Sequence, residues 1–453
     1  MHTRTLLVGV CLAGAMQAIP AIAQLAPTPL DSLVARAVAV SPTLRAARSR
    51  VDAARARVRP ASVLPDPMLM AGIINQPLGR MPADPASMTS TTGPEPMTMR
   101  MVGVEQTFPY PGKLALRRRE AEQDLAASEA ALEGARRQLV RDVKSAYYEL
   151  AFVDQALAIV GRNRDVLASL ITVTESRYGV GSGGQQDVLK ARVEATRLAE
   201  TAAGLMEQRQ AALAQLNALL DRPSETPVPS PSMPESVARA AVPVSSDQIR
   251  FTSAALGARA ADSPLPALTD LQETAIRRSP ELRELDAMIA GQSARAELAR
   301  KEYLPDVGLS LQYGQRGGGL PDMVSATVSV PIPIFKGRKQ DQEAVGATAQ
   351  LAALEADRQA KALAIRADVA RLVSEIERER TRLALAVKAI LPQSRAALAS
   401  ASASYQVGKV DFLTVLENQA TVFSYETDYF RAVSDFAKNL AELERLVGDE
   451  VLK

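Results

Sequence analysis

Few residues of this chain can support nucleophilic or metal chemistry. The sequence contains one histidine and one cysteine, His2 and Cys11, and both lie near its start. The rest of the chain therefore cannot form Ser-His or Cys-His pairs, zinc sites on imidazole or thiolate, or disulfides. It also contains no Gly-rich phosphate loop, H-E-x-x-H motif or G-x-S-x-G motif. We expect a protein that is not an enzyme, with no catalytic residue, no cofactor and no metal centre of these types.

Methionine, a possible ligand for soft metal ions, recurs within one stretch of the first half of the chain. Its thioether suits Cu(I), so these residues could contact a soft metal. The alternative, which the sequence favours, is that they fill lipid-facing strand positions and pack a loop. The methionines concerned are Met68, Met70, Met81, Met88, Met97, Met99 and Met101.

Residues 1–23 are typical of a secretory signal peptide. Arg4 supplies the positive charge, residues 6–18 are apolar, and residues 21–23 read Ala-Ile-Ala, an A-x-A cleavage site. The apolar run is too short to span a bilayer as a helix. We expect the mature chain to begin at Gln24.

Charge and composition limit the partners of the mature chain. The 53 basic and 51 acidic residues nearly balance, which argues against nucleic acid as a partner. Trp is absent and aromatic residues make up 4% of the chain, whereas Ala, Leu, Arg and Glu abound, as in long packed helices. No later apolar run reaches the roughly 18 residues of a transmembrane helix, so any membrane crossing must use strands.

Motifs recur in the same order in two halves of the chain. Ser-Pro-x-Leu-Arg begins at Ser41 and again at Ser279, and Tyr-x-Val-Gly occupies 178–181 and 405–408. Such ordered recurrence indicates an internal duplication. We divide the mature chain into a first repeat at 24–221, a Pro/Ser-rich linker at 222–266 and a second repeat at 267–453.

Each repeat contains a helical segment too long for a globular domain. Residues 113–177 contain no proline and would form a helix roughly 97 Å long. The equivalent segment, 338–405, is interrupted only by Pro392, where we expect a local bend. Shorter helices return at 185–220 and 411–447, so each repeat contributes an antiparallel helical hairpin.

Four segments have the alternating pattern of strands. Residues 307–313 and 324–330 alternate strictly, and 68–76 and 98–107 do so more weakly. The set expected to face lipid comprises Val307, Leu309, Leu311, Tyr313, Val324, Ala326, Val328 and Val330. The set expected to face a wet lumen comprises Ser310, Gln312, Ser325, Thr327 and Ser329. Open sheet edges are not tolerated in lipid, and three copies of four strands would make a closed barrel of twelve.

Together, the duplicated entries, strand pairs, Tyr-x-Val-Gly tips and Leu391-Pro392-Gln393 resemble the TolC-type outer-membrane factor family. The resemblance implies a mainly α protein with a small β part, assembled as a homotrimer in the outer membrane. Twelve strands would form its barrel, and the helical hairpins a periplasmic tunnel. It would be the passive exit duct of a tripartite efflux system, with a periplasmic adaptor and an inner-membrane pump. Residues 102–113 look most like members that serve heavy-metal RND pumps, so metal cations are the favoured cargo.

The resemblance also implies roles for individual residues. The tips that would contact the adaptor hold Tyr178, Val180, Gly181, Tyr405, Val407 and Gly408. The periplasmic gate would hold Leu413, Glu417, Asp187 and Thr414. Leu413 and Glu417 share one helix face, and Lys190 could pair with Glu417. The alternative is that Leu413 packs a seam and Glu417 is a solvated charge, while the glycines only end helices.

Other functions remain open at this stage. The chain could be the duct of type I protein secretion, or a periplasmic coiled-coil adaptor without a membrane part. A secreted hydrolase built on carboxylates would need a cleft, which the repeats do not predict. The four strand-like segments, equivalent in both halves, favour the outer-membrane duct.

Overall fold

The computed structural model describes residues 29–75, 98–228, 265–316 and 320–452. The predicted signal peptide and most of the predicted linker lie outside these ranges. The first repeat contains α1 (Pro29–Val40), α2 (Pro42–Ala61), β1 (Met68–Ile74), β2 (Met99–Phe108), α3 (Lys113–Gly179) and α4 (Gln185–Leu219). The second contains α6 (Leu268–Arg278), α7 (Pro280–Lys301), β3 (Val307–Arg316), β4 (Met323–Ser329), α8 (Gln340–Leu385), η1 (Ala386–Ile390), α9 (Leu391–Gln406) and α10 (Phe412–Val447).

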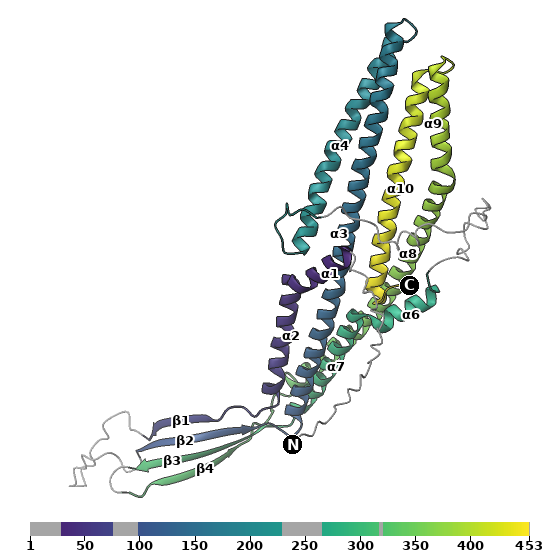
Figure 1. Ribbon diagram of the computed structural model, residues 1–453. Coiled ribbons are helices and arrows are strands. Elements are labelled where there is room, and N and C mark those ends of the chain that lie inside the picture. The colour runs from purple at the N-terminus through teal and green to yellow at the C-terminus, as the bar shows by residue number, and fades with distance from the viewer. Residues whose placement is uncertain (1–28, 76–97, 229–264, 317–319, 453) are drawn as a thin grey trace, which may run out of the picture.

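The two long helical hairpins are confirmed. Helix α3 runs unbroken for 67 residues and reverses into α4, while α8 and α9 together form the equivalent arm that reverses into α10 (Figure 1). The expected interruption near Pro392 takes the form of the π-helical turn η1. Proline cannot donate a backbone hydrogen bond and crowds the preceding turn, and a widened turn relieves both problems. None of the described helices is both long and apolar enough to span a bilayer.

The duplication extends to the hydrogen bonds that begin equivalent helices. The Ser41 hydroxyl accepts from the Leu44 amide at 3.4 Å, and the Ser279 hydroxyl accepts from the Leu282 amide at 3.1 Å. Both serines are followed by a proline in the first turn. Serine N-caps and first-turn prolines each favour helix initiation, so the repeated motif fixes the same helix start twice.

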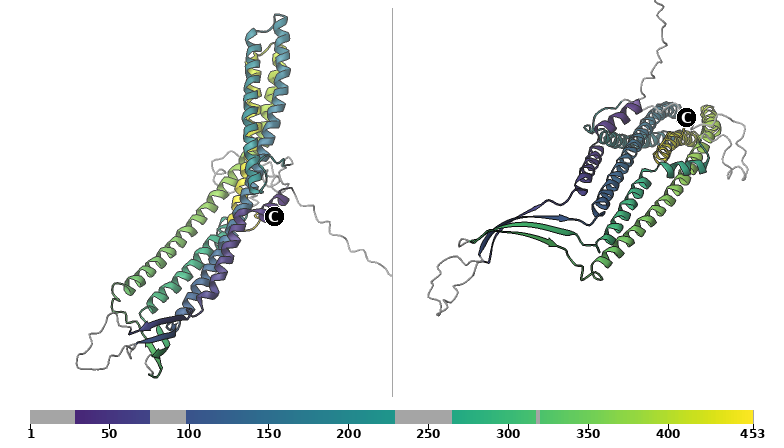
Figure 2. Two further views of the ribbon diagram at one scale, coloured as in Figure 1. Left: turned by 90° about the vertical axis from the view of Figure 1, so that its left-hand side faces the viewer. Right: turned by 90° about the horizontal axis from the view of Figure 1, so that it is seen from below.

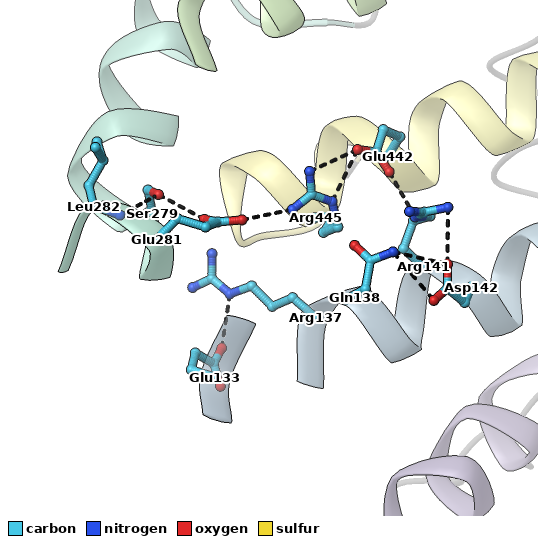
Figure 3. Close-up of polar contacts among 10 residues, drawn as sticks. All are labelled: Glu133, Arg137, Gln138, Arg141, Asp142, Ser279, Glu281, Leu282, Glu442 and Arg445. Carbon is cyan, nitrogen blue, oxygen red and sulfur yellow. Dashed lines mark hydrogen bonds and ion pairs between the residues drawn. The ribbon is translucent and has the colours of Figure 1, made fainter. Parts of the chain in front are cut away.

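The main core lies midway along the molecule, where both repeats meet. Apolar side chains of α3 are buried there, with Val143 and Leu150 fully enclosed. Ion pairs tie three helices together beside this core (Figure 3). Arg445 of α10 contacts Glu281 of α7 at 3.0 Å, and Arg141 of α3 contacts Glu442 of α10 at 2.8 Å.

The four strands form one antiparallel sheet in the order β1-β2-β3-β4. All four predicted strands are therefore confirmed, with ends shifted by at most three residues. The strands leave the ends of α2, α3, α7 and α8 as a curved ribbon (Figure 2). The sheet lies at one end of the elongated molecule and the hairpin tips lie at the other (Figure 1).

Candidate functional site: the two-faced sheet and the hairpin tips

One face of the sheet is apolar and exposed. Register aligns Leu69 with Val104, Val104 with Leu311, and Leu311 with Ala326 across the four strands. Leu69 is 75% exposed and Val324, on the same face, is 69% exposed. A contiguous apolar surface of this kind marks contact with lipid or another protein. The predicted lipid-facing residues within β3 and β4 share this face, and Val330 lies just beyond the end of β4.

The opposite face carries small and polar side chains. Ser310 lies between Glu105 and Thr327, and Gln312 between Gly103 and Ser325. The predicted lumen-facing residues therefore also share one face. Such a division of polarity is typical of strands that separate lipid from water.

The strand methionines lie on the polar face. Met101 is aligned with Gly314, and Met99 with Arg316. The interpretation that methionine fills lipid-facing strand positions is therefore wrong for β2. Up to Met101 the apolar residues of β2 fall at odd positions, and from Val102 they fall at even positions. Pairing with the strictly alternating β3 decides which of these two sets faces outward. Met81, Met88 and Met97 lie outside the described residues.

The two hairpin tips have the same backbone turn. Gly181 and Gly408 both adopt φ +73°, in the left-handed region that favours glycine. The Gly181 amide donates to the Tyr178 carbonyl at 3.0 Å, and the Gly408 amide donates to the Tyr405 carbonyl at 2.9 Å. The glycines thus serve to end their helices, which a structural role alone explains.

The valines at the tips point into solvent. Val180 is 79% exposed and Val407 is 69% exposed, and Tyr178 is half exposed beside Val180. Each valine lies at the end of its hairpin, away from the buried clusters. Exposed apolar side chains at both tips offer a contact surface for a partner.

Tyr405 differs from the other predicted tip residues because its side chain is buried. It is 3% exposed and packs against Phe412, with ring centroids 5.6 Å apart. Burial raises the pKa of the Tyr405 phenol, and the negative charge of Asp187 raises it further. A ring enclosed in this way contributes to the packing of the second tip.

Arg177 joins the two hairpins, a contact that the sequence analysis missed. Its guanidinium lies 4.6 Å from the centre of the Tyr405 ring and donates to the Tyr405 carbonyl. It also donates to the Ser182 carbonyl at 3.2 Å within its own tip. An arginine one residue before Tyr178 was the available signal, but sequence spacing alone does not reveal contacts between hairpins.

The predicted gate residues gather at the start of the two returning helices. Leu413 is 40% exposed, and Glu417, one turn further along α10, is also exposed. Thr414 instead donates from its hydroxyl to Asp411 at 2.6 Å and belongs to the cap of α10. Asp187, half-buried in the first turn of α4, lies close enough to Tyr405 to influence its pKa.

No ion pair joins Lys190 to Glu417 within the single chain that the structure describes, and their pairing stays a prediction. The charge of Lys190 acts on Asp411 instead. Hydrogen bonds from Thr414 lower the pKa of the Asp411 carboxyl most, and Lys190 lowers it further.

Comparisons with known proteins agree with this architecture. The outer-membrane channel OprN superposes with a TM-score of 0.74 at 20% identity, covering 94% of this chain and 91% of OprN. The outer membrane protein VceC from Vibrio cholerae gives a TM-score of 0.73 at 18% identity, covering 93% and 96% of the two chains.

A curated relative is similar along nearly its whole length. The cobalt-zinc-cadmium resistance protein CzcC of Cupriavidus metallidurans is 21% identical over 426 residues, which cover 93% of this chain and 90% of CzcC. The family model described as outer membrane efflux protein matches residues 33–222 and 271–449, most of both repeats. The chain belongs to the outer membrane efflux protein family, whose members are outer-membrane channels with a large periplasmic portion.

Proposed function

We propose that this chain is the exit duct of a heavy-metal efflux system, joined to a periplasmic adaptor and an RND-type inner-membrane pump. Members of this family work with an adaptor and an inner-membrane pump in tripartite systems. The observation that carries the metal assignment is the end-to-end similarity to a cobalt-zinc-cadmium resistance protein. The chain provides a passive path in this proposal and catalyses no reaction.

The open edges of the sheet support the trimer that we propose for this chain. Strands β1 and β4 each leave one edge unpaired within a single chain. Open edges cannot face lipid, because their backbone groups would lack hydrogen-bond partners. Three copies, joined β1 to β4, would close a twelve-stranded barrel with the apolar face outward and the polar face inward.

A deletion strain tests the cargo. We expect loss of the chain to increase sensitivity to Co²⁺, Zn²⁺ and Cd²⁺, and expression of the intact chain to restore resistance. Increased sensitivity to dyes and antibiotics alone would overturn the metal assignment. Loss of a secreted protein, with metal resistance unchanged, would favour the duct of type I secretion instead.

The exposed valines test the adaptor contact. Val407→Asp and Val180→Asp place a charge on surfaces 69% and 79% exposed, so neither should disturb folding. We expect normal trimer yield with resistance lost, because an apolar contact would be replaced by a desolvated charge. Leu189→Asp, a residue also exposed but further from the tip, is the matched control. Reduced trimer yield in the valine variants would contradict the contact assignment.

The proposed gate can be tested by electrical recording. In a trimer, Leu413 would form an apolar ring and Glu417 an acidic ring, which oppose ion passage and favour cations respectively. We expect Leu413→Ser with Glu417→Ala to raise conductance and weaken cation preference in planar bilayers. Asn418→Ala, on a neighbouring position of α10, serves as the control. Unchanged conductance and selectivity in an assembled trimer would move the constriction elsewhere.

A further inference from the structure

Methionines occur at four consecutive levels of the polar face of the sheet. Residues aligned by register form levels that follow one another about 6.8 Å apart. From the helical end toward the loop end, Met68, then Met70, then Met101 with Met323, then Met99 occupy four consecutive levels. We call these five residues the methionine row.

Glycines leave space for the long side chains of the row. Met70 is aligned with Gly103, Met101 with both Gly72 and Gly314, and Met323 with Gly314. The sulfur of Met99 lies 2.8 Å from the position that a Cβ at Gly314 would take. Any side chain at Gly314 would therefore displace this thioether.

The row is accessible rather than packed into a core. Met68 is 57% exposed and Met323 is 42% exposed, and the other three are half-buried. Met70 and Met101 are diagonal neighbours, and long side chains reach one another across the roughly 7–8 Å between such positions. An ion bound by a thioether on one level can therefore pass to a thioether on the next level.

Hydrophobic filling does not explain this distribution. The apolar face of the same four strands carries Leu, Val, Ile, Ala, Phe and Tyr, together with Arg100, Gln106 and Gln315, but no methionine among its described residues. If methionine served only as an apolar filler, that face would be the place for it. Instead it occurs among Ser310, Gln312 and Ser325, with Glu105 aligned beside Met68.

We propose that the methionine row is a series of weak binding sites for soft monovalent cations, Cu(I) or Ag(I). Thioether sulfur is a soft ligand that selects such ions over hard divalent cations. Several weak sites in sequence allow an ion to enter and leave, as conduction requires. The inference rests on the proposed trimer, in which the polar face lines the lumen.

The test uses the purified full-length trimer and Ag⁺ in chloride-free buffer, measured by isothermal titration calorimetry. Met81, Met88, Met97 and Met233 are replaced by Leu in every protein, so that thioethers of the mature chain outside the described residues do not contribute. In this background, replacing the row with Leu (M68L/M70L/M99L/M101L/M323L) should weaken Ag⁺ binding at least tenfold. Leu and Met have similar volumes, so the trimer should assemble.

The matched control removes two methionines elsewhere. Met206 and Met288 lie on α4 and α7 and are 57% and 40% exposed, so M206L/M288L should leave Ag⁺ binding unchanged. If the variant with all five substitutions does not assemble, M70L/M101L provides the same comparison on two levels of the row. Ag⁺ binding that survives loss of the row, or that M206L/M288L removes equally, would overturn the proposal.

A second measurement separates this inference from the proposed function. Ag⁺ should reduce K⁺ conductance through the reconstituted background channel, and the row variant should not respond. Binding without any change in conductance would show that the row lies outside the conduction path. Neither measurement depends on a pump, an adaptor or the cargo exported by cells, which the deletion strain tests separately.

Discussion

The two hairpin tips have the same backbone turn, yet their surroundings differ. Tyr178 is 50% exposed at the first tip, whereas its counterpart Tyr405 is 3% exposed at the second. Phe412 is fully buried at the start of α10, and the equivalent residue at the start of α4 is the exposed Gln185. Duplication has therefore kept the turn and changed the packing.

The difference indicates a division of roles. Tyr405, Phe412 and Val415 of the second tip are buried together in an apolar cluster, to which the first hairpin contributes Ala191 of α4 and partly buried side chains of α3. The large buried rings of this cluster all come from the second tip, and Arg177 of the first hairpin adds a polar contact to Tyr405. We infer that the second tip is the anchor and that Arg177 holds the first tip against it.

The largest expected effect comes from removing the anchor. Phe412 is 0% exposed, and Phe412→Ala should cost about 3–5 kcal/mol of local stability. The matched change at the first tip, Gln185→Ala, should cost less than about 0.5 kcal/mol. Hydrogen exchange of the amides near residues 398–416 measures the difference. Equal loss of protection in both variants would show that the two tips do not differ in packing.

An intermediate effect should follow from cutting the contact between hairpins. Arg177→Ala removes a charged donor to the Tyr405 and Ser182 carbonyls, worth about 1.5–3 kcal/mol in comparable cases. Ser404→Ala, at the equivalent position of the second hairpin, is the control. We expect the arginine variant alone to raise single-channel conductance in planar bilayers. If conductance stays at the wild-type level, Arg177 does not hold the tips together.

The smallest effect concerns the helix caps. Asp411 accepts from the Thr414 amide at 3.2 Å, whereas Gly184, its counterpart before α4, has no side chain to do so. Because the folded pKa of Asp411 is lowered from its ordinary value of 3.8, its cap stabilises the tip above that pH. The stabilisation is lost as the pH falls below 3.8 through the lowered folded value.

Asp411→Ala should therefore weaken protection of the amides at the start of α10 at neutral pH and have no effect in strong acid. Gly184→Asp should give the first tip the same dependence on pH. Hydrogen exchange measured across the acid range checks both changes. If the first tip of the Gly184→Asp variant responds to acid in the same way as the wild type, the introduced aspartate does not form a cap there.

Much of the architecture follows from local sequence. The long stretch without proline determines α3, serine before proline determines the starts of α2 and α7, and Tyr-x-Val-Gly determines both turns. These are properties of neighbouring residues along the chain, and periodicity or a fixed turn motif reports them directly. The duplication and the two-faced character of β3 and β4 are likewise legible from the sequence.

Contacts between segments distant in sequence were decided only by the tertiary structure. The weak alternation of β2 permits either face to point outward, and its pairing with β3 placed Met99 and Met101 on the polar face. In the same way, both tips contain a tyrosine in the same motif, and only packing between hairpins buried Tyr405 and brought Arg177 to it. Local periodicity gives the faces of an element, but which face meets which neighbour depends on partners hundreds of residues away.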